Sequence, residues 1–234
     1  MTIVIPIHNE AEFLPRALPH LLRELDGVAA DCHIILVENG STDGTADTAR
    51  RLSPGQPIEV MVHPEPDYGG AMRAGFLAAT GEWVVNFDID YYSGGFLAQA
   101  LALSEQADLI IASKRNPQSQ DNRSLTRRMG TYVFNVALRL ILNSHVSDTH
   151  GMKAFRKDLV ERVAPLVVSR KDIFDTELVL RAERMGYRIA EVPVVVQEMR
   201  EARSSLWRRA PRTLKGLFQL RSTFANERRN TTSR

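Results

Sequence analysis

Short apolar runs alternate with amphipathic segments over residues 2–90. The runs that we expect to form strands are rich in β-branched residues and lie at 2–6, 34–37, 58–62 and 83–87. Apolar side chains recur at helical spacing in the segments between them, which predicts helices at 13–25, at about 43–52 and at about 68–80. This alternation predicts an α/β fold, in which helices flank a mostly parallel sheet.

The second half of the chain lacks this regular repeat. The elements that we expect there are a strand at 109–113, a polar basic loop at 114–128, helices at about 129–142, 159–167 and 176–186, and an apolar strand at 189–196. Beyond them, residues 206–224 carry an apolar stripe with basic residues beside it, and Pro211 is expected to interrupt or start a helix there. We divide the chain into a domain at 1–202 and a basic amphipathic tail at 203–234.

Polar residues follow several of the predicted strands. Asn9 and Glu10 follow the first, Glu38 the second, and Asp88-Ile89-Asp90 the fourth. The carboxyl ends of parallel strands meet at one edge of a sheet, where ligands bind in such folds. Two carboxylates separated by one residue can both approach a hard divalent cation, so Asp88 and Asp90 are the candidate metal ligands.

Composition restricts the class of protein. Of the 234 residues, 44% are hydrophobic and 25% are charged, which excludes disordered, collagen-like and coiled-coil chains. The single cysteine, Cys32, excludes an internal disulfide and a zinc site built from cysteines, and it fits a reducing, cytoplasmic location. The apolar runs are too short for a membrane-spanning helix, and we expect no secretory signal.

Charge is distributed unevenly along the chain. The net charge is +2, but residues 197–234 carry +7 and the remainder carries −5. A basic tail suits anionic lipid, nucleic acid or a phosphate-bearing substrate. Its apolar stripe suits an interfacial helix in peripheral contact with the cytoplasmic face of a membrane, or equally a helix packed on its own domain or on a second subunit.

Three segments together resemble family 2 glycosyltransferases of the GT-A fold. Residues 2–10, TIVIPIHNE, are similar to the opening "VVIPxYNE" of that family. Residues 38–45, ENGSTDGT, are similar to "DDGSTDGT", and residues 68–76, YGGAMRAGF, to "KGGALRxGF". Asp88-Ile89-Asp90 follows at the position of the family's D-x-D. The resemblance implies a nucleotide-sugar donor and a Mg²⁺ or Mn²⁺ ion as cofactor.

The resemblance also implies roles for individual residues. Asp88 and Asp90 would be catalytic and would ligate the metal, and Asp43 would cap a helix. The implied donor-binding residues are Pro6, Asn9, Glu10 and Glu38 for the base and ribose, Gly69 and Gly70 for close backbone approach, and Arg73, Asp88, Ile89 and Asp90.

The second half is similar to dolichyl-phosphate and polyprenyl-phosphate mannose synthases. Residues 147–156, SDTHGMKAFR, resemble their "sDxtsGFKlyrr", Arg127 and Thr131 match "RxxxS", and residues 200–205 resemble "RxxGxS". The likeness implies an inverting mannosyl transfer from GDP-mannose to a polyprenyl phosphate, with Arg127 and Arg200 as catalytic residues. The implied contacts of the acceptor phosphate are Arg115, Arg127, Thr131, Arg200 and Ser205.

Some positions depart from that pattern and leave alternatives open. Tyr92 replaces the Gln of D-x-D-x-Q, and Tyr68 replaces the common Lys. A glycosyltransferase that acts on a soluble hydroxyl, such as a natural product, would need a general base, and the candidates are Asp148, Asp175 and Glu177. A non-catalytic nucleotide-sugar or nucleic-acid binder is disfavoured, because both acids of the D-x-D are present. We therefore expect no nucleic-acid partner, and the sequence leaves the oligomeric state open.

Overall fold

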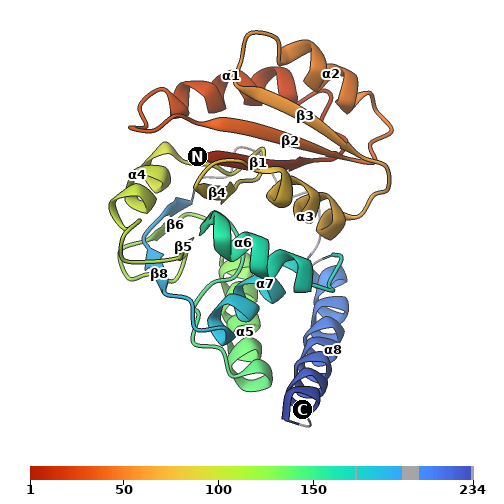
Figure 1. The fold of residues 1–234 in the computed structure, drawn as a ribbon, viewed down its shortest axis with the longest axis vertical. Helices are drawn as coiled ribbons and strands as arrows, with labels where there is room; N and C mark the ends of the chain where they lie inside the picture. Colours follow the sequence, from red (N-terminus) through yellow and green to blue (C-terminus); the bar gives the residue numbers. More distant parts are fainter. Residues whose placement is uncertain (172, 197–205, 233–234) are drawn as a thin grey trace.

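The computed structural model describes residues 1–171, 173–196 and 206–232 (Figure 1). The helices are α1 (Leu14–Leu25), α2 (Thr45–Leu52), α3 (Tyr68–Ala78), α4 (Gly94–Ala102), α5 (Leu125–Leu142), α6 (Lys157–Val163), the short 3-10 helix η1 (Ala164–Leu166), α7 (Phe174–Arg184) and α8 (Leu206–Thr232). The strands are β1 (Thr2–Ile7), β2 (His33–Asn39), β3 (Ile58–His63), β4 (Trp83–Asn86), β5 (Leu109–Ala112), β6 (Gln120–Asp121), β7 (Lys153–Arg156), β8 (Ile189–Val192) and β9 (Val195–Val196).

Seven strands form one sheet in the order β3-β2-β1-β4-β7-β5-β8. β1 pairs in parallel with β2 and β4, and β5 pairs in parallel with β8. The expected mostly parallel sheet is therefore confirmed. β7 is the exception, because it runs antiparallel between β4 and β5. Its reversed direction places the loop that precedes it at the edge where the parallel strands end.

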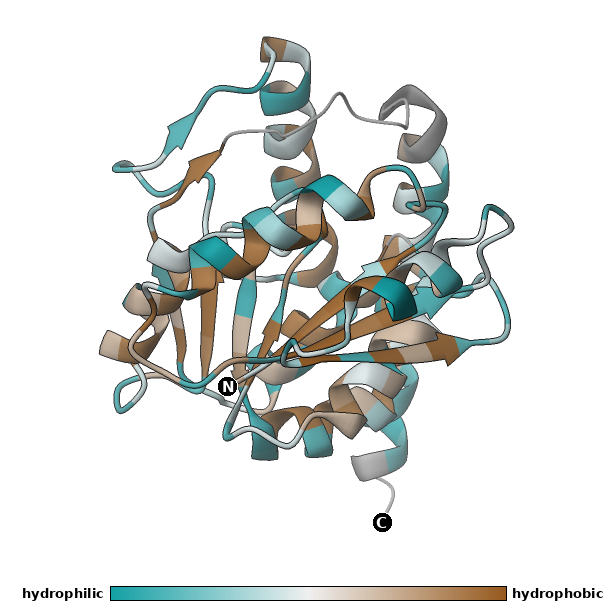
Figure 2. Ribbon diagram, turned by 90° about the horizontal axis from the view of Figure 1, so that it is seen from above, coloured by the Kyte–Doolittle hydropathy of each residue, from teal (hydrophilic) through white to brown (hydrophobic). Residues whose placement is uncertain are grey.

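Alternation along the strands produces two buried layers. Ile3, Ile5 and Ile7 of β1 point to the face covered by α1, α2 and α4, whereas Val4 points to the face covered by α3, α6 and α7. Figure 2 shows the strands as largely hydrophobic between helices whose outer sides are more hydrophilic. Since a strand buried on both faces needs apolar residues at successive positions, these strands appear in the sequence as continuous apolar runs.

The C-terminal helix α8 packs on the body of the protein. Leu217, Leu220 and Phe224 are buried in a third apolar cluster, which also contains Leu138 of α5 and Leu180 of α7. Arg181 of α7 is ion-paired to Glu177, 2.7 Å away, and to Glu227 of α8, 2.9 Å away. In Figure 1 α5 and α8 extend away from the sheet.

Two expectations about local structure were wrong in detail. The helix at the C-terminal end continues through Pro211, which lies near its beginning and does not interrupt it. The expected single strand at 189–196 is divided into β8 and β9 around Pro193. Proline cannot donate a ladder hydrogen bond, and after it Val195 and Val196 pair with β6 instead of β5. None of the described helices is long and apolar enough to cross a membrane.

Asp108 ties three strands together at the edge opposite the strand-end loops. Its Oδ1 accepts a hydrogen bond of 2.7 Å from Nη2 of Arg188, which precedes β8, and its Oδ2 accepts one of 2.9 Å from the Arg188 backbone N–H. Arg156 of β7 lies 3.7 Å from the same carboxylate. The hydrogen bonds from Arg188 outweigh the effect of burial and lower the pKa of Asp108.

We predict that Asp108→Asn lowers the free energy of unfolding at pH 7, because the charged hydrogen bonds from Arg188 are lost. The decrease should be only about 1 kcal/mol, because Arg188 is largely exposed and solvent screens the pair. A lowered folded-state pKa stabilises the protein above the ordinary pKa near 4, and this contribution is lost as the pH falls through the folded-state value. In urea titrations, the difference in the free energy of unfolding between the variant and the wild type should therefore shrink as the pH falls below about 4. Asp47→Asn, at an exposed pair with Arg50, is the control, and a difference for Asp108→Asn that is independent of pH would contradict the prediction.

Candidate functional site

The loops after β1 and β2 are joined through Asn9. Its backbone N–H donates to Ser41 Oγ over 2.9 Å, and its side-chain Oδ1 accepts from the Thr42 N–H over 2.9 Å. Asn9 has a φ of 54°, in the left-handed region that asparagine tolerates better than most residues. The side chain predicted to contact the donor therefore also fixes the shape of the loop that carries it.

Asp43 fastens the same two loops from the other side. Its Oδ1 accepts from the Thr45 N–H over 3.0 Å at the start of α2, and its Oδ2 accepts from the Ala11 N–H over 3.1 Å. Thr45 Oγ1 accepts in turn from the Glu10 N–H over 2.8 Å. Burial acts to raise the pKa of Asp43, but the hydrogen bonds from Thr45 and Ala11 outweigh it and lower that pKa. Asp43 thus joins two loops, and the expected capping role is wrong in detail, because the N-cap residue of α2 is Gly44 and Asp43 lies one position before it.

Two further acids, Glu10 and Glu38, lie at or just after the ends of β1 and β2. Glu38 is buried, is paired in register with Ile7, and accepts through Oε1 from the Ser41 N–H over 2.5 Å. Glu10 is buried, and its carbonyl accepts from the Leu14 N–H where α1 begins. Pro6 is the penultimate residue of β1, in register with Val37. These three predicted donor-binding residues therefore share the edge where β1 and β2 end.

The glycines of the third motif are in close contact with protein atoms. A Cβ at Gly69 would lie 2.7 Å from the carbonyl oxygen of Ser169, and one at Gly70 would lie 2.9 Å from Nε2 of His63. Arg73 donates from its guanidinium to the carbonyl of Val167. Gly69 therefore allows α3 to pack against the segment before α7, and Gly70 allows it to pack against the end of β3. Their close approach to a nucleotide stays a prediction.

Asp88 and Asp90 lie in a tight turn after β4. The Asp88 N–H donates to the Tyr91 carbonyl over 3.2 Å, and the Tyr91 N–H donates back over 3.0 Å. Ile89 is 3% exposed and belongs to the core, while the two aspartates on either side are partly exposed. The side chain of Ile89 therefore anchors the turn, and only its backbone is left to face a ligand.

Two buried lysine–carboxylate pairs surround Asp88. Lys153 Nζ, on β7, lies 3.1 Å from Oδ1 of Asp175, at the start of α7. Lys114 Nζ, just after β5, lies 3.1 Å from Oδ2 of Asp148, in the loop before β7. Tyr68 of α3 donates to the other oxygen of Asp175 over 2.8 Å. The ends of four elements meet at these charges.

This cluster holds more acids than bases. Among the described residues, the carboxylates of Asp88, Asp148 and Asp175 lie beside the ammonium groups of Lys114 and Lys153, His150 is also close to Asp148, and Asp90 adds a further negative charge. Burial raises the pKa of Asp88 to about 6, reinforced by Asp175 and Asp90 and opposed by the two lysines. An ionised Asp88 is therefore destabilised unless a cation joins it.

The donor set fits a divalent cation. Carboxylate oxygens are the ligands that Mg²⁺ and Mn²⁺ prefer, and the excess negative charge calls for a cation. Among the described residues, no group of three or more His, Cys, Asp or Glu side chains could hold a metal ion. Mg²⁺ typically takes one or two protein carboxylates and completes its shell with water and substrate phosphates. Asp88 and Asp90 are the residues that could hold such an ion.

His150 connects this cluster to α5. Its ring packs edge-on against Phe134 of α5, with the centroids 4.9 Å apart. Burial lowers the pKa of His150, and the nearby charges of Asp148 and Asp175 oppose this. α5 therefore lies beside the acidic cluster.

Most of the predicted acceptor residues lie in the basic loop and on α5. The Arg115 guanidinium lies 5.1 Å from the ring centroid of Tyr132, and Arg127 is partly exposed in the first turn of α5. Thr131 Oγ1 donates to the Arg127 carbonyl over 3.1 Å and accepts from Arg123 over 3.3 Å. The structure thus brings Arg115 of the loop close to α5, which carries Arg127 and Thr131 beside the cluster. Arg200 and Ser205 lie outside the described residues.

The three candidate bases for a hydroxyl acceptor are all hydrogen-bonded. Asp148 and Asp175 are paired with lysines, as described above. Glu177 is fully buried, pairs with Arg181 and accepts from the N–H groups of Val168 and Ser169 over 3.1 and 2.8 Å. Glu177 therefore holds the chain before α7 and is buried away from solvent.

Tyr92, which replaces the usual Gln after the D-x-D, points to α1. Its hydroxyl lies 2.9 Å from Nδ1 of His20 and 3.3 Å from the carbonyl of Ala17. Burial raises the pKa of Tyr92 to about 12. This side chain thus braces the loop after β4 against a helix.

Sequence reasoning missed the two lysines of the cluster. Lys153 stands at the K of the segment 147–156 that resembles the mannose synthases, and Lys114 opens the basic loop, but a role was predicted for neither. The position of Lys153 within an apolar run was the available signal, because a lysine that is buried in a strand requires a carboxylate partner.

Comparison with known sequences assigns the chain to a family. The profile of Glycosyl transferase family 2 matches residues 2–164. An uncharacterized glycosyltransferase of Mycobacterium tuberculosis is 31% identical over 195 residues, which cover 83% of this chain and 84% of that protein. The undecaprenyl-phosphate mannosyltransferase of Micrococcus luteus is 29% identical over 213 residues, which cover 86% of each chain.

Solved structures share the fold at low identity. A mannosyltransferase from Pyrobaculum calidifontis, in complex with GDP-Man and Mn²⁺, matches with a TM-score of 0.61 at 23% identity, over 88% of this chain and 59% of that one. The glucosyl-3-phosphoglycerate synthase of Mycobacterium tuberculosis, in complex with Mn²⁺, UDP and glucosyl-3-phosphoglycerate, matches with a TM-score of 0.64 at 20% identity, over 93% and 79% of the two chains. The expected GT-A fold is confirmed, and the profile match over most of the chain shows that this protein belongs to Glycosyl transferase family 2.

Proposed function

We propose that this glycosyltransferase moves mannose from GDP-mannose onto a polyprenyl phosphate, with Mg²⁺ or Mn²⁺ held by Asp88 and Asp90. One observation carries the proposal: an excess of carboxylates around Asp88 lies beside a helix and loop that carry Arg115 and Arg127. The carboxylates suit a metal-bound diphosphate, and the two arginines suit an acceptor phosphate. The Micrococcus luteus relative and the Pyrobaculum calidifontis structure support the choice of lipid and donor.

The proposed reaction needs little acid–base chemistry from the protein. The phosphate oxygen of the acceptor is ionised at neutral pH, so it can attack the anomeric carbon without a general base. The bond from that carbon to the diphosphate breaks, and its electron pair leaves with the diphosphate. A bound divalent cation supplies charge neutralisation for this leaving group. Attack from the opposite side converts an α-linked donor into a β-linked product.

The arginines would position the attacking group. Guanidinium groups bind phosphate oxygens in pairs, which restrains both the distance and the angle of attack. Arg127 lies on the α5 turn that also presents Thr131, and Arg115 follows Lys114 directly in the chain. An acceptor phosphate held by these residues would lie near the acidic cluster, because Lys114 is itself part of that cluster.

A small phosphorylated hydroxyl acceptor is the second candidate. The glucosyl-3-phosphoglycerate synthase whose fold this chain shares is in complex with a product of that type. Such an acceptor would use the same arginines for its phosphate but would also need a base. This candidate is disfavoured because each possible base, Asp148, Asp175 or Glu177, is already ion-paired with a lysine or an arginine.

The experiment offers labelled GDP-mannose or UDP-glucose, with Mg²⁺ or Mn²⁺, to undecaprenyl phosphate, undecaprenol or 3-phosphoglycerate. We expect label to enter the organic phase only with GDP-mannose and undecaprenyl phosphate, as a β-linked product. Labelled phosphoglycerate would establish the second candidate instead. An α-linked lipid product would refute the inverting mechanism.

We predict that Asp90→Asn lowers kcat/KM for the donor by about 100-fold or more, because the cation loses a ligand and the leaving diphosphate loses stabilisation. The measurement is transfer or donor hydrolysis over a titration of Mn²⁺. Asp47→Asn removes an exposed acid of α2 and should leave both unchanged. Equal activity of the Asp90 and Asp47 variants at every metal concentration would exclude Asp90 as a ligand.

We predict that Arg127→Ala raises the KM for a short, water-soluble isoprenyl phosphate by about 10-fold or more, since a charge-assisted hydrogen bond to phosphate is lost. The KM for the donor should change little. Arg128→Ala, at the exposed neighbouring position of α5, is the matched control. An equal rise of the acceptor KM in both variants would show that general positive charge, and not Arg127, binds the phosphate.

A further inference from the structure

The outer face of α5 exposes an unusual amount of apolar surface. Fourteen large hydrophobic side chains are exposed among the described residues, and six of them lie on this helix, with between 36% and 78% of their surface accessible. These six residues, which we call the α5 apolar stripe, are Leu125, Met129, Tyr132, Val133, Val136 and Leu140. Contiguous apolar surface of this kind marks a site of interaction.

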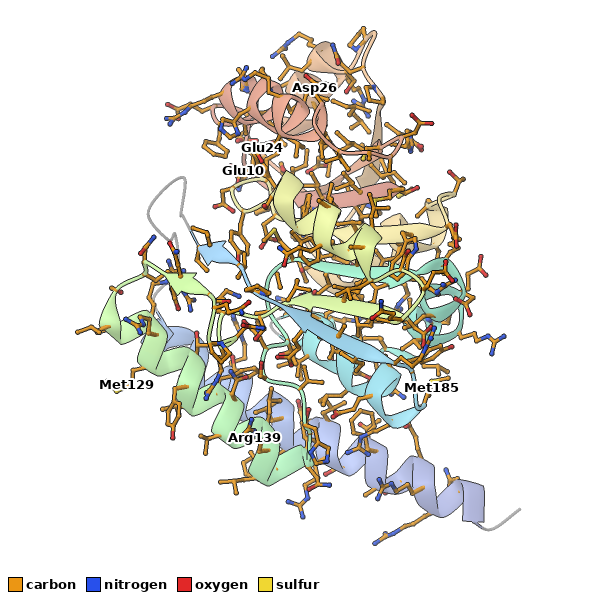
Figure 3. The ribbon with its side chains drawn as sticks, turned by 90° about the vertical axis from the view of Figure 1, so that its left-hand side faces the viewer. Glu10, Glu24, Asp26, Met129, Arg139 and Met185 are labelled. Atoms are coloured by element: carbon orange, nitrogen blue, oxygen red, sulfur yellow. The ribbon has the colours of Figure 1, made fainter. Side chains whose placement is uncertain are left out.

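The stripe is continuous along the helix. Its members are separated by three or four residues, apart from the adjacent Tyr132 and Val133, so at about 100° per residue they occupy one side through more than four turns. The opposite side is packed, with Leu138 and Leu142 buried against α7 and α8. In Figure 3 Met129 lies near one end of α5, and its side chain points away from the sheet. α5 therefore has two apolar faces, one buried against the rest of the protein and one exposed.

Charge indicates what covers the stripe. α5 carries Arg127, Arg128 and Arg139 and contains no acidic residue. Arg128 and Arg139 are exposed and fall at the same border of the stripe when the helix is viewed along its axis. An apolar stripe bordered by arginines is typical of helices that lie in the surface of an anionic bilayer. A second copy of this chain would bring arginines against arginines, which disfavours a symmetric dimer through the same face.

The stripe is also continuous with the proposed acceptor site. Tyr132 belongs to the stripe, and its ring carries the guanidinium of Arg115 at 5.1 Å. Arg127 and Thr131 lie on the inner side of the same helix, beside the loop that contains His150. A lipid phosphate at the level of the headgroups would thus meet Arg115 and Arg127 while its hydrocarbon chain stays in the bilayer.

The C-terminal helix α8 packs against α5 and does not offer an alternative surface for lipid. Leu217, Leu220 and Phe224 of α8 are buried, so they are unavailable for lipid unless the helix leaves its site. Leu214 and Phe218 are the exposed large apolar residues of the described part of α8. The basic tail that the sequence suggests as a membrane contact therefore has its main apolar face covered by α5 and α7.

We propose that the α5 apolar stripe, with Arg128 and Arg139, docks the protein on an anionic lipid bilayer. This deepens the proposed function, since a polyprenyl phosphate resides in a bilayer, but vesicle binding is measured without turnover. The two proposals can therefore fail separately.

The test compares binding of the full chain to vesicles of phosphatidylcholine with and without phosphatidylglycerol. We expect the wild type to sediment with phosphatidylglycerol vesicles, and the triple variant Met129→Ser/Val133→Ser/Leu140→Ser to bind them at least about 10-fold more weakly. Leu214→Ser/Phe218→Ser on α8 is the matched control and should bind nearly as the wild type does. Arg128→Glu/Arg139→Glu should lose the preference for phosphatidylglycerol.

Transfer to a short, water-soluble isoprenyl phosphate should be unchanged in the triple variant, while transfer to undecaprenyl phosphate in vesicles should fall. Failure of the wild type to bind phosphatidylglycerol vesicles would overturn the proposal, as would equal losses in the α5 and α8 variants. A dimer that the triple variant converts to monomers, with vesicle binding intact, would assign the stripe to a second copy and also overturn it. Vesicle binding by the stripe without any lipid product would refute the acceptor and leave the docking surface established.

Discussion

The pairing of Lys153 with Asp175 is the interaction on which the arrangement of the site depends. Lys153 is 1% exposed in the antiparallel strand β7, and its ammonium also donates to the Gly151 carbonyl over 2.7 Å. An unpaired charge in such a place costs several kcal/mol, so β7 and the first turn of α7 are held in one relative position. Tyr68 binds the same aspartate and adds α3 to the assembly.

The same cluster gives the site its chemistry. Its carboxylates outnumber its ammonium groups, and this imbalance contributes, together with burial, to the raised pKa of Asp88. A protein that served stability alone would have balanced these charges or removed them, since perturbed titrating groups gather at functional sites. The loops after β1 and β2 show the contrasting case, because there Asp43 and Asn9 use their polar atoms to make the loops rigid. Rigid loops beside an unbalanced cluster suit a site that binds a charged donor and holds it still.

The first half of the fold could be predicted from the sequence, and the second half only in outline. The four strands and three helices up to Asp90 follow a regular repeat, so periodicity and the polar strand ends located them well. β7 was missed as a strand because its four residues, Lys153–Arg156, mix two basic residues with two apolar ones and show no clear period. The cluster's lysines were missed for a related reason, since pairing across 22 residues, as between Lys153 and Asp175, leaves no local pattern.

The sequence by itself determined the alternation of strands and helices and the edge where the acids gather, because hydrophobic period and strand-end position are local properties of a chain. It also determined that the segment that forms α8 has an apolar stripe with basic residues beside it. Only the tertiary structure decided that the buried side of α8 packs on α5 and α7 while the outer stripe of α5 stays open. The physical reason is that an apolar stripe specifies burial without specifying the partner, and the partner depends on which surfaces the rest of the fold brings within reach.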